Sequence, residues 1–250
     1  MKTNLYIPAW SRTATMLLIG SWMSCSFHLN AQSGLDPSYR EIHEEADRRY
    51  LPSDLLLNGE KYNYTYRNDD GTPFLEVPGD PLASVQYGEE TYTGQRIRYD
   101  MYNQVMVLEF EDISGARGSL VLQHERIREV EIGTSRFRWF TDMEGSGRYG
   151  QVIGEGAYQA VFFWQKQYLP DLDNGQEHYF FTDPVRKTFI RHGDRMCPFK
   201  RKWSLLKCFP EPMREPVRTF LKLHRIRIRK ATVEEVGAML NDVNQWEAHA

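Results

Sequence analysis

Four basic side chains are spaced so that they could bind an anion together. Arg214, Arg218, Lys222 and Arg225 follow one another at intervals of four, four and three residues, which places them on one face of a helix. Three more basic residues follow before residue 231. The stripe predicts a surface for an anionic partner such as lipid head groups or acidic polysaccharide. The alternative is that basic helices dock on an acidic β body and keep their remaining charge in solvent.

The distribution of charge along the chain is compatible with both interpretations. Residues 33–183 contain 14 Lys plus Arg against 27 Asp plus Glu, a balance of −13. Residues 184–250 contain 15 against 7, a balance of +8. The C-terminal part is therefore strongly basic although the whole chain has a formal net charge of −3.

Cys197 and Cys208 are predicted to form a disulfide. They are the two cysteines that remain once an N-terminal segment containing Cys25 is removed, and an even pair in an exported protein usually bridges. A bridge closing 11 residues (208 − 197) would stabilise the fold by roughly 2–3 kcal/mol. Two unlinked buried thiols are the alternative. A metal site is disfavoured because no second Cys or His pair has usable spacing.

Several short motifs suggest a reaction or a cofactor, but each lacks its context. Gly145–Gly150 matches the glycine pattern of a dinucleotide loop, yet the following residues read as strands where a helix is needed. Asp171–Gly175 lacks the further ligands of a calcium loop. The acid pairs Glu89-Glu90 and Asp69-Asp70 lie beside glycines in predicted loops. We therefore predict no catalytic residue, no cofactor and no metal ligand.

The first 32 residues resemble a secretory signal peptide in their layout. They contain two basic and no acidic residues, and Ala14–Met23 is an apolar stretch too short to span a membrane. Small and polar residues follow, and cleavage is expected near Ala31 or Gln32. Lipoprotein processing at Cys25 is the alternative. The mature chain is then expected in the periplasm, at the cell surface or outside the cell, with no transmembrane span. In these compartments nucleic acid is a disfavoured partner.

Residues 33–199 are predicted to form an antiparallel β body. Apolar residues alternate with polar ones in short runs from Lys61 to Phe199, the pattern of strands with one buried face. Turn residues separate these runs, and Asn174-Gly175 is the clearest hairpin signal. The sequence therefore predicts a mainly β fold, either a β-sandwich or a barrel-like body, with a possible short helix near 38–49. Inward-facing positions within 118–141 are Leu120, Leu122, Val130, Ile132, Phe137 and Trp139.

Residues 200–250 are predicted to form a basic appendage of about three short helices in the same domain. Three sets of apolar residues there recur every three or four positions. The first contains Trp203, and the second, around Pro216, is expected to begin near Arg214 because proline suits a first turn. Thr232 and Glu235 form a capping box that starts the last helix at about Val233.

Three short segments resemble a group of uncharacterised exported bacterial envelope proteins. They are Leu57-Asn58-Gly59 followed by Tyr62, the segment Gly71–Leu75, and Arg98–Tyr102. The resemblance implies a β-rich fold and a location in the envelope. It supplies no catalytic residues.

Three functions remain open. The first is a non-catalytic exported protein that binds an anionic envelope component or another envelope protein. The second is a small-ligand carrier with Tyr99, Phe137, Trp139, Phe163 and Trp164 lining a barrel mouth, although such residues more often form a core. The third is a hydrolase of polysaccharide with an unrecognised pair of carboxylates.

Overall fold

The computed structural model describes residues 56–66, 71–112, 114–141, 147–171 and 178–248. These residues belong to the larger of two compact units, Ile42–Ala250. The predicted signal peptide 1–32, Cys25 and the helix expected near 38–49 lie outside the described residues.

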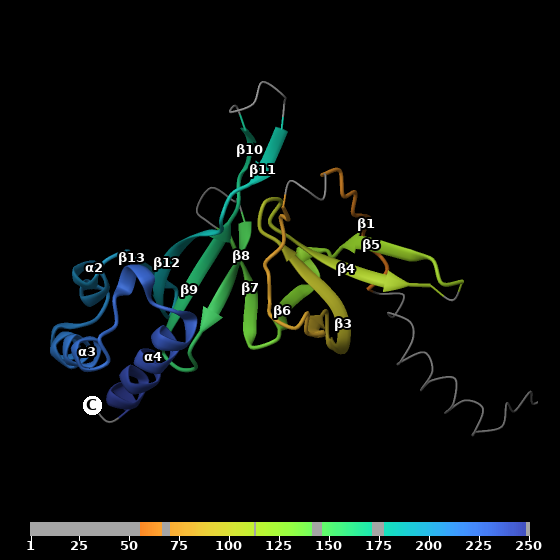
Figure 1. Cartoon of the computed structure of the whole chain (residues 1–250). Helices are drawn as coiled ribbons and strands as arrows, with labels where there is room; N and C mark the ends of the chain where they lie inside the picture. The colour runs from red at the N-terminus through yellow and green to blue at the C-terminus, as the bar shows by residue number, and fades with distance from the viewer. Residues whose placement is uncertain (1–55, 67–70, 113, 142–146, 172–177, 249–250) are drawn as a thin grey trace, which may run out of the picture. The chain divides into compact units, whose positions relative to one another are not determined.

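The described chain is mainly antiparallel β structure, as predicted, with helices at its C-terminal end (Figure 1). The strands are β1 (Glu60–Lys61), β2 (Ala83–Tyr87), β3 (Glu90–Asp100), β4 (Val105–Glu111), β5 (Arg117–Val121), β6 (Ile127–Ile132), β7 (Ser135–Thr141), β8 (Gly147–Ile153), β9 (Tyr158–Gln165), β10 (Tyr168–Asp171), β11 (His178–Phe181), β12 (Val185–His192) and β13 (Arg195–Phe199).

Eleven strands form one sheet in the order β1-β5-β4-β3-β2-β6-β7-β8-β9-β12-β13. β10 and β11 pair separately, on either side of the predicted hairpin at Asn174-Gly175, whose own residues lie outside the described part. The outer strands β1 and β13 do not pair with each other, so the sheet is not a closed barrel.

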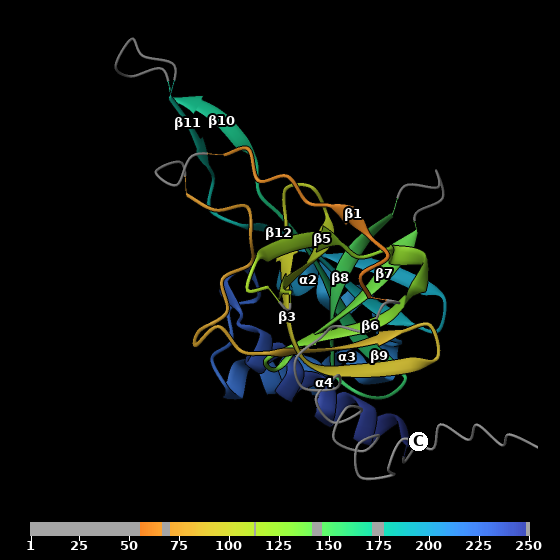
Figure 2. The same cartoon turned by 90° about the vertical axis from the view of Figure 1, so that its right-hand side faces the viewer.

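One half of the sheet is strongly curled (Figure 1 and Figure 2), and its strands share an apolar core. The buried side chains of this core come from β2, β3, β4, β6, β7 and β8 and the loops between them, so these strands must surround a common space. Burying each large apolar side chain contributes about 1.5–3 kcal/mol. Trp139 packs against the margin of this core, and Leu120 is only half-buried and lies outside it. The other four residues predicted to face inward belong to the core: Leu122, Val130, Ile132 and Phe137.

The other half of the sheet is covered on one face by the helices. These are α2 (Lys202–Lys207), α3 (Glu211–Leu223) and α4 (Val233–Ala248), with a short 3-10 turn η3 (Ile228–Lys230) between the last two. Their apolar residues share a second core with β8, β9, β12 and β13. The strands end at Phe199, so the predicted boundary between the β body and the appendage coincides with the end of β13.

The start of α4 follows the predicted capping box. The backbone N–H of Glu235 donates to Thr232 Oγ1 at 3.2 Å, and the backbone N–H of Thr232 donates to Glu235 Oε2 at 3.0 Å. Each such contact satisfies a backbone donor that the first helical turn leaves without a partner.

Two predictions for the other helices were wrong. α3 begins at Glu211, so Pro216 lies inside it and not in its first turn. The helix tolerates the missing N–H of Pro216 because its apolar face is held by the second core. Trp203 does not belong to the buried face of α2; its side chain is 57% exposed.

A buried carboxylate fixes the turn between β3 and β4. Asp100 is 0% exposed, and its oxygens accept hydrogen bonds from the Tyr62 hydroxyl at 2.8 Å and from the backbone N–H groups of Tyr102 at 2.9 Å and Asn103 at 2.8 Å. The side-chain amide of Asn103 donates a fourth at 2.7 Å. Side-chain bonds of this kind replace the backbone bonds that a turn leaves unmade.

Residues of three separate segments meet around this carboxylate: Tyr62, Phe74 and Arg98. Phe74 forms an isolated bridge with Asp100, and its ring lies 5.9 Å from that of Tyr62. The guanidinium of Arg98 stacks over the same Phe74 ring at 3.9 Å. These positions therefore have a structural role in joining the chain before β2 to the end of β3.

Candidate functional site

The four predicted anion-binding residues do not form one free basic face. Arg214 is half-buried, and its Nε donates to the backbone carbonyl two residues before α3 at 3.0 Å. Arg218 forms an ion pair with Glu215. Lys222 and Arg225 are exposed and form no ion pair with any described residue. Half of the stripe is therefore available to a partner.

A second group of cations surrounds a cleft of about 270 Å³, whose wall is formed mostly by the carbon atoms of their side chains. Arg201 and Lys202 come from the start of α2, and Arg227, Arg229 and Lys230 come from η3 and the residue before it. We call these five residues the basic cleft. All five are exposed, and within the described chain none forms an ion pair with a carboxylate.

Local contacts hold the two sides of the basic cleft in place. The hydroxyl of Ser204 accepts a hydrogen bond from the backbone N–H of Arg201 at 3.0 Å, which fixes the entry to α2. Ile228 is buried in the second core and anchors η3. Arg186 on β12 donates to the carbonyl of Ala231, at the end of η3. The cations are thus carried on backbone that the core fixes.

The predicted disulfide is present and closes the loop that carries one side of the basic cleft. Cys197 on β13 and Cys208 at the end of α2 are bonded, with their Cα atoms 5.6 Å apart. Arg201 and Lys202 lie between them in the sequence. The bridge therefore ties the sheet directly to the first helix of the appendage.

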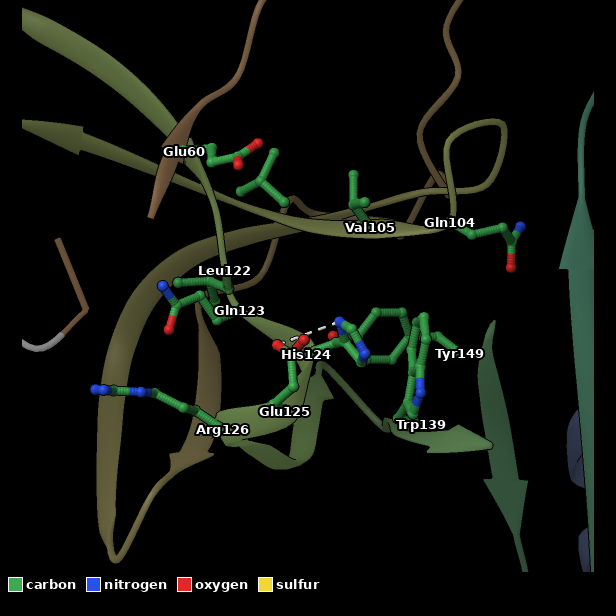
Figure 3. A pocket seen from close by; sticks show the side chains of 11 residues that line it. Glu60, Gln104, Val105, Leu122, Gln123, His124, Glu125, Arg126, Trp139 and Tyr149 are labelled. Carbon is green, nitrogen blue, oxygen red and sulfur yellow. Dashed lines mark ion pairs between the residues drawn. The ribbon is translucent and has the colours of Figure 1, made fainter. Parts of the chain in front are cut away.

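A different pocket, of about 570 Å³, lies inside the curl of the sheet (Figure 3). Val105 and Val121 line it from β4 and β5, and Trp139 and Tyr149 line it from β7 and β8. The short 3-10 turn η2 (His124–Arg126) completes the lining. We call this space the sheet pocket.

Three aromatic rings form one corner of the sheet pocket. The centroid of Trp139 lies 4.0 Å from that of His124 and 4.9 Å from that of Tyr149, and Figure 3 shows the three side chains together. His124 Nδ1 is 3.4 Å from a carboxylate oxygen of Glu125. Tyr149 is 1% exposed, and its hydroxyl has no hydrogen-bond partner among the described residues. Burial raises the pKa of this hydroxyl well above its usual value.

The aromatic residues predicted to line a carrier's mouth are divided among three places. Tyr99 and Phe137 are fully buried in the core of the curl. Trp139 lines the sheet pocket. Phe163 and Trp164 line another pocket, at the strand ends.

Among the described carboxylates, those that line the sheet pocket and those of the predicted pair Glu89-Glu90 lie in separate places. Glu60 and Glu125 both line the sheet pocket, but Figure 3 shows them on different walls, and both are exposed. Glu89 and Glu90 lie exposed at the turn between β2 and β3, and Asp69-Asp70 lies outside the described residues.

No group of three or more His, Cys, Asp or Glu side chains that could hold a metal ion occurs in the described ranges. In the same ranges, no helix is both long and apolar enough to cross a membrane.

Comparison of the chain with known protein families, with curated proteins and with solved structures gives no match. The functions of the basic cleft and the sheet pocket are therefore inferred from the residues that form them.

Sequence reasoning did not find the whole basic cleft. Arg201 and Lys202 are separated from Arg227 by about 25 positions, and no periodicity links them. The sequence indicated only part of this surface, through the excess of positive charge after residue 183 and the basic residues Arg227, Arg229 and Lys230 that follow the stripe.

Proposed function

We propose that the protein is exported, is not an enzyme, and binds the anionic lipid head groups of the cell envelope through the basic cleft. The observation that carries this proposal is the gathering of five exposed cations that have no carboxylate partner in the described chain. Such a surface attracts polyanions. Near an anionic membrane, each Lys or Arg contributes about 1 kcal/mol.

Exposed apolar side chains on α2 and α3 favour a lipid surface over a soluble polysaccharide. Trp203 follows the cleft residue Lys202 and is 57% exposed; the ammonium of Lys207 lies 4.9 Å from its ring centroid. Leu223, beside Lys222, is 75% exposed. Tryptophan and basic residues together are typical of segments that rest at a membrane interface, where charged head groups cover an apolar layer.

The disulfide supports the proposed location. Bonds between cysteines form and persist in oxidising compartments such as the periplasm and the cell exterior, and they are rare in the cytosol. The signal-like pattern of residues 1–32 points to the same compartments.

Binding to vesicles tests the proposed function. We expect the protein to sediment with phosphatidylcholine vesicles that contain phosphatidylglycerol, less so as salt is raised, and not with phosphatidylcholine alone. Reversing two cleft charges, Arg227→Glu with Arg229→Glu, should weaken this binding at least about 30-fold, since two attractive charges of about 1 kcal/mol each are lost. Lys222→Glu with Arg225→Glu should act in the same direction.

The matched control reverses two exposed charges of the β body, Arg96→Glu with Arg128→Glu, and should leave vesicle binding almost unchanged. Absence of binding by the parent protein at low salt would reject the proposal. An equal loss in the control would show that net charge alone is responsible. Binding to dextran sulfate as tight as to the vesicles would assign the surface to acidic polysaccharide instead.

The sheet pocket favours a second function, that of a small-ligand carrier. Its buried Tyr149 hydroxyl lacks a protein partner within the described residues, and buried polar groups in proteins are nearly always hydrogen-bonded. A ligand that accepts a hydrogen bond would satisfy it.

The free energy of unfolding shows whether that hydroxyl is unpaired in the protein alone. We expect Tyr149→Phe to raise it by about 1 kcal/mol, because an unsatisfied buried hydroxyl is removed. Tyr99→Phe is the control: the Tyr99 hydroxyl donates to Gln104 Oε1 at 2.8 Å, so its loss should lower the same quantity by about 1 kcal/mol. Destabilisation by both substitutions would contradict an available Tyr149 hydroxyl.

A further inference from the structure

A third pocket, of about 360 Å³, lies where three neighbouring strands begin or end. Gly147 opens β8, Gln165 closes β9 and Val185 opens β12, and all three line it. We call it the rim pocket. It shares no residue with the basic cleft.

Two of the three strands that line the rim pocket, β8 and β12, contribute positive charge to it. Arg148 comes from β8, and Arg186 and Lys187 come from β12. No Asp or Glu belongs to the described lining. The three cations therefore lie together without a carboxylate to balance them.

Aromatic rings accompany these cations because of the strand register. Trp164 on β9 lies opposite Arg186, and Phe163 lies opposite Lys187. The guanidinium of Arg186 is 5.5 Å from the Trp164 ring centroid, and that of Arg148 is 5.8 Å from the Phe163 ring centroid. Stacking of this kind orders a guanidinium while leaving its N–H groups free to bind.

Both arginines are half-buried and have donors to spare. Arg186 gives one described hydrogen bond, to the carbonyl of Ala231, and burial lowers the pKa of its guanidinium. Arg148 forms no hydrogen bond or ion pair with any described residue. Half-buried guanidinium donors are strong ligands for carboxylate, phosphate and sulfate oxygens.

We propose that the rim pocket binds a small organic anion: a phosphate, sulfate or carboxylate attached to a planar or apolar group. The anionic group would lie between Arg148 and Lys187, which project from the same face of the sheet as Phe163. The apolar group would contact Phe163. Arg186 and Trp164 close the pocket from the opposite face, where Arg186 also stacks over the Phe162 ring at 4.5 Å. The volume is at the lower end of ordinary ligand pockets, which are ~300–1,000 Å³.

Phenyl phosphate is a suitable probe because it combines both features. Its binding can be followed by NMR on the indole N–H of Trp164, which donates to Gln151 Oε1 at 2.8 Å. The nitrogen-proton signal of this group is assigned by its absence in Trp164→Phe. We expect a saturable shift of this signal with phenyl phosphate. Inorganic phosphate and benzyl alcohol, each with one of the two features, should bind at least about 10-fold more weakly.

Substitutions separate the rim pocket from general attraction by positive charge. Arg148→Ala with Lys187→Ala should weaken phenyl phosphate binding at least about 10-fold, the loss expected for charge-assisted hydrogen bonds. Arg96→Ala with Arg128→Ala, which removes two exposed cations elsewhere, should leave it unchanged. Thermal unfolding of each variant checks that the fold is intact.

Three results would overturn the proposal: no saturable shift in the parent protein, equal affinity for inorganic phosphate, or equal losses in the two double variants. The variant Arg227→Glu with Arg229→Glu should keep its affinity for phenyl phosphate while losing vesicle binding. Failure of the lipid proposal can therefore be told apart from failure of this one.

Discussion

Replacing Asp100 with alanine is expected to lower the free energy of unfolding by about 3–5 kcal/mol. The substitution removes the acceptor of four hydrogen bonds at a site that is 0% exposed. A buried donor left without a partner costs about 1–3 kcal/mol, and the outer donors on Asn103 can turn to water. Urea unfolding followed by tryptophan fluorescence measures the effect.

Two further substitutions show whether burial causes this loss. Asp112→Ala removes a carboxylate that accepts similar turn bonds from Ser114 and Ala116 but is exposed, and its effect should be much smaller. Tyr62→Phe removes one of the four bonds to Asp100 and should cost about 1 kcal/mol. Equal effects of Asp100→Ala and Asp112→Ala would contradict the role of the buried carboxylate in joining β3 to the preceding chain.

Removing the disulfide is expected to lower the free energy of unfolding by roughly 2–3 kcal/mol. The bridge closes 11 residues, and a cross-link of this length chiefly restricts the unfolded chain. The variant Cys197→Ala with Cys208→Ala should unfold at a lower denaturant concentration than the oxidised parent protein. Dithiothreitol should lower the stability of the parent to a similar level and have no effect on the variant. A variant as stable as the oxidised parent would contradict the prediction.

Much of the fold could be predicted because its signals are local. Alternation of apolar residues indicated the strands around Leu122, Val130 and Phe137, and the capping box of Thr232 and Glu235 indicated the start of α4. The order of the strands could not be read in the same way. β2 lies between β3 and β6 in the sheet. No short segment of the sequence specifies which strands become neighbours in this way.

The binding sites depended on distant residues and were therefore harder to predict. Arg214, Arg218 and Lys222 lie on α3, but Arg225 lies beyond its end at Leu223, and Glu215 pairs with Arg218. The rim pocket joins Arg148 with Lys187 through the register of three strands. Helical periodicity describes one element at a time, whereas these groups arise from contacts between elements.

The two outer strands of the large sheet limit how a second polypeptide could attach to it. β1 is two residues long, and β13 contains Pro198, which has no N–H to offer. An unpaired sheet edge otherwise acts as a template for strand addition and aggregation. Within the described chain, these two edges offer few backbone groups with which another strand could pair. Strand addition at these two edges is therefore disfavoured, whereas the separate β10–β11 pair has edges of its own.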